Sequence, residues 1–225
     1  MGPAISEILP LAVGIMISPI AIVAVILMLF SPRARANGPS FLIGWIVGLS
    51  IVTVVVYLIA DSADVASDSS ASDTTSTTKV VLGVVLMFLA LRQWRGRPAP
   101  GETSPPPKWM GAIDSVTPVK AVGLGVLLSA VNPKNLILAV GAAAAIAQTG
   151  PSTGDAVVAI IVFVLIASLG IIVPVAAYLF AGERARTMLD GWKSWLEEHN
   201  AAVMTVVLLL IGVVLIGKGL GLLTA

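Results

Sequence analysis

Long apolar stretches alternate with short polar ones along the chain, and most of the apolar stretches are long enough to span a membrane. About 20 consecutive apolar residues let an α-helix cross the hydrocarbon core of a bilayer. The pattern predicts an all-α integral membrane protein with six transmembrane helices, at about residues 8–30, 41–60, 79–93, 119–149, 156–180 and 201–223.

Two of these stretches, the first and the fourth, are interrupted by a polar residue followed by proline. These pairs are Ser18–Pro19 and Asn132–Pro133. Proline is favoured in the first turn of a helix, and Ser and Asn are good caps just before it. We therefore expect both helices to be broken into two half-helices at these pairs. The alternative is that each proline only kinks a continuous span, with Ser or Asn repairing the lost hydrogen bond.

The polar segments between the apolar stretches differ in character. Residues 61–78 are rich in Asp, Ser and Thr, a composition that cannot bury apolar area and predicts an exposed loop. Residues 94–117 contain a proline-rich run, which predicts a linker. In residues 183–199, apolar and charged side chains separate onto two faces of a helix, which predicts an amphipathic helix in the membrane interface.

Matching motifs recur in the two halves of the chain in the same order. Ile17-Ser18-Pro19 corresponds to Val131-Asn132-Pro133, and the run from Gly83 to Leu86 corresponds to the run from Gly212 to Leu215. With three helices in each half, the second half enters the membrane from the opposite side. The sequence thus predicts an inverted three-plus-three repeat, formed by residues 1–93 and 118–225 and joined by the linker 94–117.

Basic residues are distributed unequally between the two sides of this topology. One side carries ten of them, and the other carries only Lys79 and Lys218. Lys and Arg concentrate in cytoplasmic loops. We therefore expect a multi-pass protein of the plasma (inner) membrane, with both termini extracytoplasmic and the linker cytoplasmic. The ten residues are Arg33, Arg35, Arg92, Arg95, Arg97, Lys108, Lys120, Arg184, Arg186 and Lys193.

Composition narrows the function classes. The chain is 57% hydrophobic and 11% charged, and it contains no Cys and one His. Disulfides and thiolate metal sites are therefore excluded, and no cluster of acids or His suggests another metal site or a cofactor. A hydrolase would need a carboxylate pair, a metal cluster or a nucleophile with a base, so we expect no enzyme. A net charge of +1 gives no indication of a nucleic-acid partner.

Lys134 lies near the middle of the fourth stretch, where an ammonium is costly unless it is paired or hydrated. None of the predicted spans contains Asp or Glu. Backbone carbonyls freed at a helix break could satisfy this ammonium, or it could face a cavity and attract an anionic substrate, aided by the half-helix N-termini. The candidate substrate-binding residues are Ser18, Pro19, Asn132, Pro133, Lys134 and Asn135.

At Ser18–Pro19, the loop from Ser31 to Gly38 and the run from Asn132 to Asn135, the chain resembles the lysine-exporter (LysE) superfamily. Within it, the chain is most similar to the GAP family, the glycopeptidolipid- or sulfolipid-addressing proteins of mycobacterial-type envelopes. The resemblance covers nearly the whole chain. The absence of cysteine excludes the thiol-electron carriers that are related to this superfamily, because they need a cysteine pair.

The resemblance implies a plasma-membrane protein that moves an envelope lipid or another small solute outward. We expect a transporter that exports a small or lipidic solute, with the bilayer and an anionic lipid or small-molecule substrate as partners. Two alternatives stay open: an amino-acid exporter, and a non-transporting accessory subunit of a larger lipid exporter. The sequence also leaves a homo-oligomer open.

Overall fold

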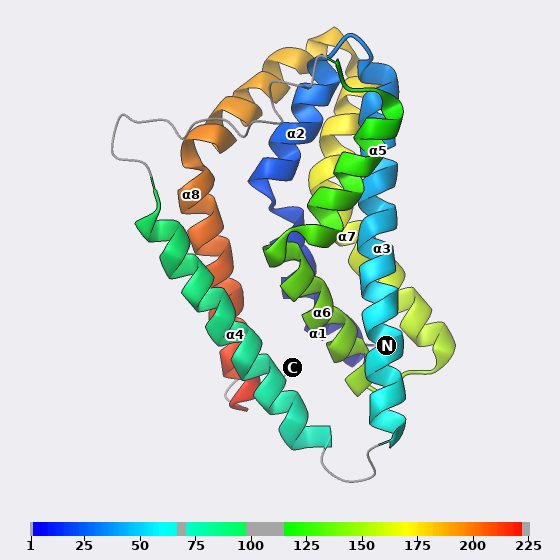
Figure 1. Ribbon diagram of the computed structural model, residues 1–225, viewed down its shortest axis with the longest axis vertical. Coiled ribbons are helices and arrows are strands. Elements are labelled where there is room, and N and C mark those ends of the chain that lie inside the picture. The colour runs from blue at the N-terminus through cyan, green and yellow to red at the C-terminus, as the bar shows by residue number, and fades with distance from the viewer. Residues whose placement is uncertain (1, 67–70, 98–114, 222–225) are drawn as a thin grey trace.

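The computed structural model describes residues 2–66, 71–97 and 115–221, and within these ranges the chain is helical, with no strand. Polar residues next to several apolar stretches extend the helices beyond the hydrophobic segments, as at residues 34–40, 61–66 and 183–200. The helices in chain order (Figure 1) are α1 (Gly2–Met16), α2 (Pro19–Phe30), α3 (Ala34–Ala66), α4 (Ala71–Arg95), α5 (Pro118–Val126), the π-helical turn η2 (Leu127–Val131), α6 (Pro133–Gln148), α7 (Thr153–Ala181) and α8 (Glu183–Gly219).

Four of the described helices, α3, α4, α7 and α8, are long and apolar enough to cross a membrane. The pair α1 and α2 bends by 52° at its junction, and the segment from α5 through η2 bends by 64° against α6. Each bent pair is apolar enough to form one further span, so the described residues provide four to six spans. This number agrees with a multi-pass membrane protein.

Exposed apolar side chains cover the outside of the helices. Phe180 is 92% exposed, Phe88 is 64% exposed and Ile59 is 63% exposed. Contiguous apolar surface of this kind is unfavourable in water and marks contact with a membrane or a partner. The interior is filled by a separate apolar set that includes Phe41, Trp45 and Phe163, all of which are fully buried.

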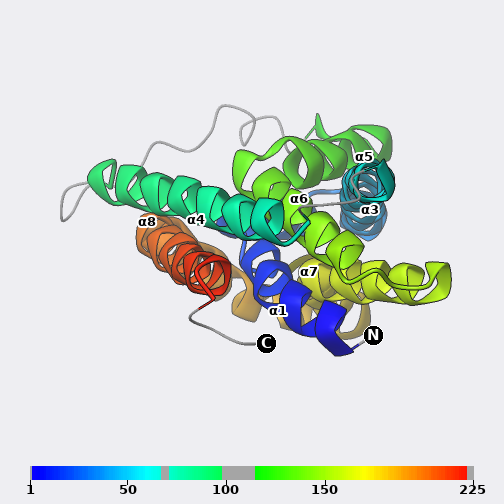
Figure 2. The same ribbon diagram turned by 90° about the horizontal axis from the view of Figure 1, so that it is seen from below.

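The helices α4 and α8 run side by side in both views (Figures 1 and 2) and form an antiparallel pair beside the other helices. Glycine makes this close approach feasible. A Cβ on Gly83 would collide with the carbonyl oxygen of Gly212, and a Cβ on Gly212 would crowd the carbonyl oxygen of Gly83. Small residues let helix backbones approach closely in lipid, so this pair depends on both glycines.

Glycines also join α3 to α5. A Cβ on Gly44 would meet the backbone of Val122, and a Cβ on Gly48 would meet Ser129 and the backbone of Val126. The small-xxx-small spacing of Gly44 and Gly48 therefore serves packing within the subunit.

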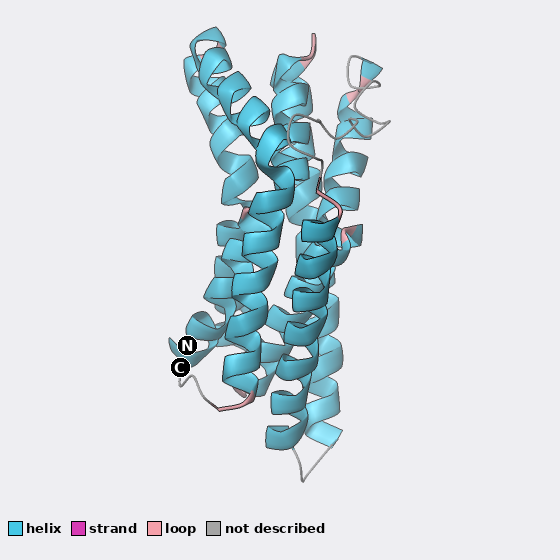
Figure 3. Cartoon of the chain, turned by 90° about the vertical axis from the view of Figure 1, so that its left-hand side faces the viewer, coloured by secondary structure: helices cyan, strands magenta, loops and turns pink. Residues whose placement is uncertain are grey.

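Both chain ends lie at the same end of the elongated bundle (Figure 3). The C-terminal end of α3 and the N-terminal end of α4 lie at this end too, whereas the loop between α2 and α3 and the turn between α7 and α8 lie at the opposite end (Figure 1). Arg33 and Arg35, in and just after the loop, and Arg184 and Arg186, just after the turn, are four of the basic residues predicted to share one side, and these four lie at the end away from the termini. Lys108 and most of the linker 94–117 lie outside the described residues.

Two polar segments differ from their predicted structures. Residues 61–66 continue α3, and residues 71–78 already belong to α4, so the prediction of a loop over 61–78 is wrong for these residues. Both segments are directly attached to long helices, so elongation of an existing helix costs little. Residues 183–199 are also not a separate helix, because α8 continues through residue 200 without interruption. Its Leu189 and Leu196 are buried, while Trp192 and Trp195 stay exposed.

Candidate functional site

The first helix break lies between α1 and α2. The backbone N–H of Ser18 donates to the carbonyl of Met16 over 3.1 Å, and that of Ile22 donates to the carbonyl of Ser18 over 3.0 Å. Ser18 is 2% exposed, but its side chain makes no capping hydrogen bond to α2. Ser18 thus takes the predicted N-cap position, with Pro19 first in α2, but it lacks the side-chain hydrogen bond that a cap normally makes. The first N–H groups of a helix have no intrahelical partner, and here the local side chain does not supply one.

The second break, at Asn132, is stabilised by its own neighbours. The Asn132 Oδ1 accepts a hydrogen bond from the backbone N–H of Lys134 over 3.1 Å, which is an N-cap of α6. Asn135 Nδ2 donates to the carbonyl of Leu128 over 2.9 Å. Asn135 thus returns to the π-helical turn before the break and satisfies one of its carbonyls.

Lys134 connects the two breaks. Its Nζ donates to the carbonyls of Gly14 and Ile17, each over 2.8 Å. Both carbonyls lie at the C-terminal end of the first half-helix, where the break removes their intrahelical donors. Of the two explanations that the sequence leaves open, the structure contains the contacts of the first: freed carbonyls hold the ammonium.

The ammonium of Lys134 is nevertheless an isolated positive charge. Lys134 is 3% exposed, and no described carboxylate forms an ion pair with its ammonium. Carbonyl dipoles compensate a buried charge only in part. The N-terminus of α2, which carries partial positive charge, follows directly after the Ile17 carbonyl that Lys134 binds. The centre of the protein therefore has an excess of positive charge.

The predicted site residues divide into two groups. Ser18, Pro19, Lys134 and Asn135 are buried, and Lys134 contacts the residue just before Ser18. Asn132 is half-buried and Pro133 is exposed, so the structure does not bring Pro133 into a buried site. The Asn135 Oδ1 is buried and has no hydrogen-bond partner, so Asn135 retains an acceptor close to Lys134.

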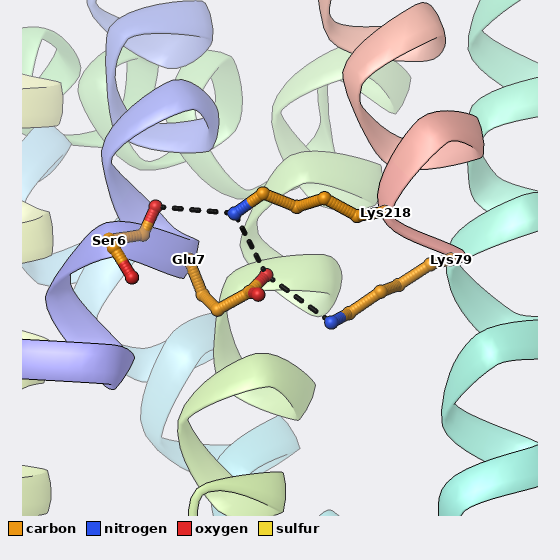
Figure 4. Close-up of polar contacts among 4 residues, drawn as sticks. All are labelled: Ser6, Glu7, Lys79 and Lys218. Carbon is orange, nitrogen blue, oxygen red and sulfur yellow. Dashed lines mark hydrogen bonds and ion pairs between the residues drawn. The ribbon is translucent and has the colours of Figure 1, made fainter. Parts of the chain in front are cut away.

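A second polar cluster joins three helices near the termini (Figure 4). Glu7 Oε2 lies 3.3 Å from Lys79 Nζ and 3.4 Å from Lys218 Nζ. Lys218 also donates to the carbonyl of Ser6 over 3.5 Å. Glu7 belongs to α1, Lys79 to α4 and Lys218 to α8, and their side chains are 14%, 19% and 12% exposed.

Sequence reasoning did not bring these three residues together. They lie at the ends of three predicted spans that start or finish on the same side of the membrane. This common depth is the feature of the sequence that could have indicated their proximity. A small pocket adjoins the cluster, with Glu7 and Lys79 in its wall; it is lined further by Leu11, Thr78, Leu82, Gly141, Gln148 and Leu215.

Groups of three or more His, Asp or Glu residues that could hold a metal ion do not occur in the described residues. The Lys134 centre offers an ammonium and the amide side chains of Asn132 and Asn135, and the second cluster offers two ammonium groups beside the Glu7 carboxylate. Ammonium and amide groups bind anions and hydrogen-bond acceptors.

Comparison with known proteins gives one family. The model of the family described as Sap, sulfolipid-1-addressing protein, matches residues 8–221. No curated protein and no solved structure matches. The matched range includes both helix breaks, Lys134, Lys79 and Lys218.

Proposed function

The chain belongs to the sulfolipid-1-addressing protein family, and we propose that it is a transporter that moves an envelope lipid with an anionic headgroup outward across the plasma membrane. The family description concerns the addressing of a lipid. The apolar helices of the described residues place such an activity in a membrane.

The observation that carries the proposal is the pair of broken helices joined by Lys134. Broken helices at the membrane midplane place half-helix N-termini and free carbonyls where a substrate can bind. Here Lys134 of α6 holds the carbonyls of Gly14 and Ile17. The anionic headgroup would replace these carbonyls as the partner of the ammonium, with Ser18, Pro19 and Asn135 beside it and Asn132 and Pro133 at its edge.

An inverted repeat underlies this arrangement in our proposal, and three observations support it. Gly83 and Gly212, which occupy equivalent positions in the two halves, meet at the crossing of α4 and α8. Lys134 binds the carbonyl five residues before Pro19, and Asn135 binds the carbonyl five residues before Pro133. The packing of α3 on α5 corresponds to that of α7 on α1.

One departure from this symmetry concerns the two ends of the bundle. Next to the termini, α1 packs against α6. The equivalent pair at the other end, α2 and α5, shows no comparable packing. An inverted-repeat transporter alternates between states in which one end or the other is closed. In our proposal the described state is closed at the end with the termini and more open at the basic end.

The basic end is the cytoplasmic side in this proposal, because Lys and Arg concentrate there. Both termini are then extracytoplasmic, and the lipid enters from the cytoplasm. Placement within the larger lysine-exporter superfamily, which rests on the paired proline motifs, is part of the same proposal.

A translocation assay in proteoliposomes tests this function. The substrates are a fluorescent sulfated glycolipid (sulfatide), its neutral parent galactosylceramide, and radiolabelled lysine. We expect the wild-type chain to move sulfatide and not the other two. Transport should be lost in Lys134→Ala, weakened in Asn132→Ala and retained in Lys134→Arg, while Lys120→Ala, an exposed change on α5, serves as the matched control. Movement of lysine instead would establish an amino-acid exporter.

A non-transporting accessory subunit is the second candidate. Its supporting observation is the exposed aromatic face of α8, where Trp192 is 39% and Trp195 is 53% exposed, together with the two backbone carbonyls that already bind Lys134. If a folded wild-type chain moves none of the three substrates, the accessory role is favoured. That role then predicts co-purification with a larger exporter, lost in Trp192→Ala/Trp195→Ala.

A further inference from the structure

The cluster of Glu7, Lys79 and Lys218 has an excess of positive charge. Two ammonium groups share one carboxylate, and both contact the same oxygen, Glu7 Oε2, at 3.3 and 3.4 Å. Lys218 also donates to the neutral carbonyl of Ser6 over 3.5 Å, near the upper limit for a hydrogen bond. One positive charge is therefore left uncompensated.

The surroundings make this excess charge costly. The three side chains are between 12% and 19% exposed, so water reaches them only in part. Asp61 and Asp155, two carboxylates toward this end whose side chains the structure describes, form no ion pair with either lysine. An unneutralised ammonium in a partly buried, low-dielectric setting favours the binding of an anion.

The geometry restricts the shape of that anion. Because both ammonium groups converge on a single oxygen, the cluster is arranged to hold one compact oxyanion between α4 and α8. Lysine binds such groups as a point charge. The small adjoining pocket is lined further by the polar residues Thr78 and Gln148 and by the apolar residues Leu11, Leu82 and Leu215.

We propose that Lys79 and Lys218 form a binding site for a sulfate or phosphate monoester, in which Glu7 occupies the place of the ligand oxygen when the site is empty. The ligand enters by displacing the Glu7 carboxylate from the two ammonium groups. The identity of the ligand as a transported lipid at its exit rests on the proposed function, whereas the binding of the oxyanion rests on the cluster itself.

This site predicts opposite effects of its own residues. Removing the Glu7 charge takes away the internal competitor, so Glu7→Gln should raise the affinity for the anion several-fold. Lys79→Gln or Lys218→Gln should lower it about tenfold, equivalent to about 1.4 kcal/mol. If the ion pairs of the cluster only hold the three helices together, all three substitutions weaken the same contacts, and none of them raises the affinity for the anion.

The experiment measures equilibrium binding by native mass spectrometry on the purified full chain in detergent. The probes are sulfatide, galactosylceramide as the matched neutral lipid, and inorganic sulfate as competitor. We expect the wild-type chain to prefer sulfatide over galactosylceramide by about tenfold or more. This preference should be lost in Lys79→Gln and Lys218→Gln, and it should be retained in Lys79→Arg and Lys218→Arg. It should be enhanced in Glu7→Gln and unchanged in Lys120→Gln. Displacement of sulfatide by millimolar sulfate indicates that the free ion binds as well; without displacement, the site recognises the lipid-borne group.

Equal binding of the two glycolipids, or weaker sulfatide binding in Glu7→Gln, would overturn the proposal. Thermal unfolding of each variant checks the fold, and if a Lys→Gln variant does not fold, the Glu7→Gln and Lys→Arg variants still decide the result. Because binding in detergent needs no translocation, a failure here is distinct from a failure of the transport assay.

Discussion

The two helix breaks look alike in sequence but are stabilised in different ways. At the second break, Asn132 caps α6 and Asn135 returns to the Leu128 carbonyl, so both partners lie within seven residues. At the first break, Ser18 makes no cap, and the carbonyls of Gly14 and Ile17 are bound by Lys134, 120 and 117 residues away. One break is satisfied locally, and the other depends on the tertiary fold.

This difference indicates what holds the two halves together. In the membrane interior a free backbone group costs several kcal/mol because no water replaces its partner. The first break therefore cannot form without α6 in place, whereas the second can. Lys134 is thus a structural tie and a candidate binding group at the same time, and substitutions around the two breaks separate these contributions.

The largest effect is expected for Lys134→Met. This change leaves the Gly14 and Ile17 carbonyls without a donor, and it should lower the free energy of unfolding by about 2–4 kcal/mol. The measurement is unfolding by SDS in mixed micelles, with Lys120→Met on the exposed face of α5 as control. Equal stability of Lys134→Met and wild type would show that the first break is satisfied without α6.

A smaller effect is expected for Asn135→Leu. This change removes the donor to Leu128 but leaves the connection between the halves, so the loss should be about 1–2 kcal/mol. Hydrogen exchange should rise near residues 127–132 and stay unchanged near residues 14–18. Faster exchange at the first break as well would mean that the two breaks are coupled.

Asn132→Ala tests the cap alone. Loss of an N-cap side chain costs about 1 kcal/mol, and we expect this decrease in the same SDS titration. Asn132→Ser, which retains a capping oxygen, should recover most of it. If Asn132→Ser is as unstable as Asn132→Ala, the cap is not the source of the effect.

The smallest effect is expected for Ser18→Ala. Because the Ser18 side chain does not cap α2, its removal should change the free energy of unfolding by less than about 0.5 kcal/mol. The contrast with Asn132→Ala, the matching position of the other half, is the sharpest test of the comparison. A loss as large as that of Asn132→Ala would show that the two breaks are stabilised alike after all.

The sequence by itself determined the all-helical membrane class, because about 20 apolar residues in a row have few other stable arrangements. Local capping also depends only on neighbouring residues, as at Ser152, whose Oγ accepts from the backbone N–H of Asp155 over 3.2 Å. Such contacts join residues three apart, so a short pattern contains all of their parts. The match of residues 8–221 to a lipid-addressing family likewise needs only the order of residues.

Only the tertiary structure decided which distant groups meet. The sequence indicates that carbonyls freed at a helix break could hold Lys134. It does not identify them as those of Gly14 and Ile17, because every residue has a backbone carbonyl. Glu7, Lys79 and Lys218 lie on three separate helices, and their convergence depends on how α1, α4 and α8 pack. Hydropathy indicates which segments can span the membrane, but it does not determine which helices are neighbours. That depends on side-by-side packing, as between Gly83 and Gly212.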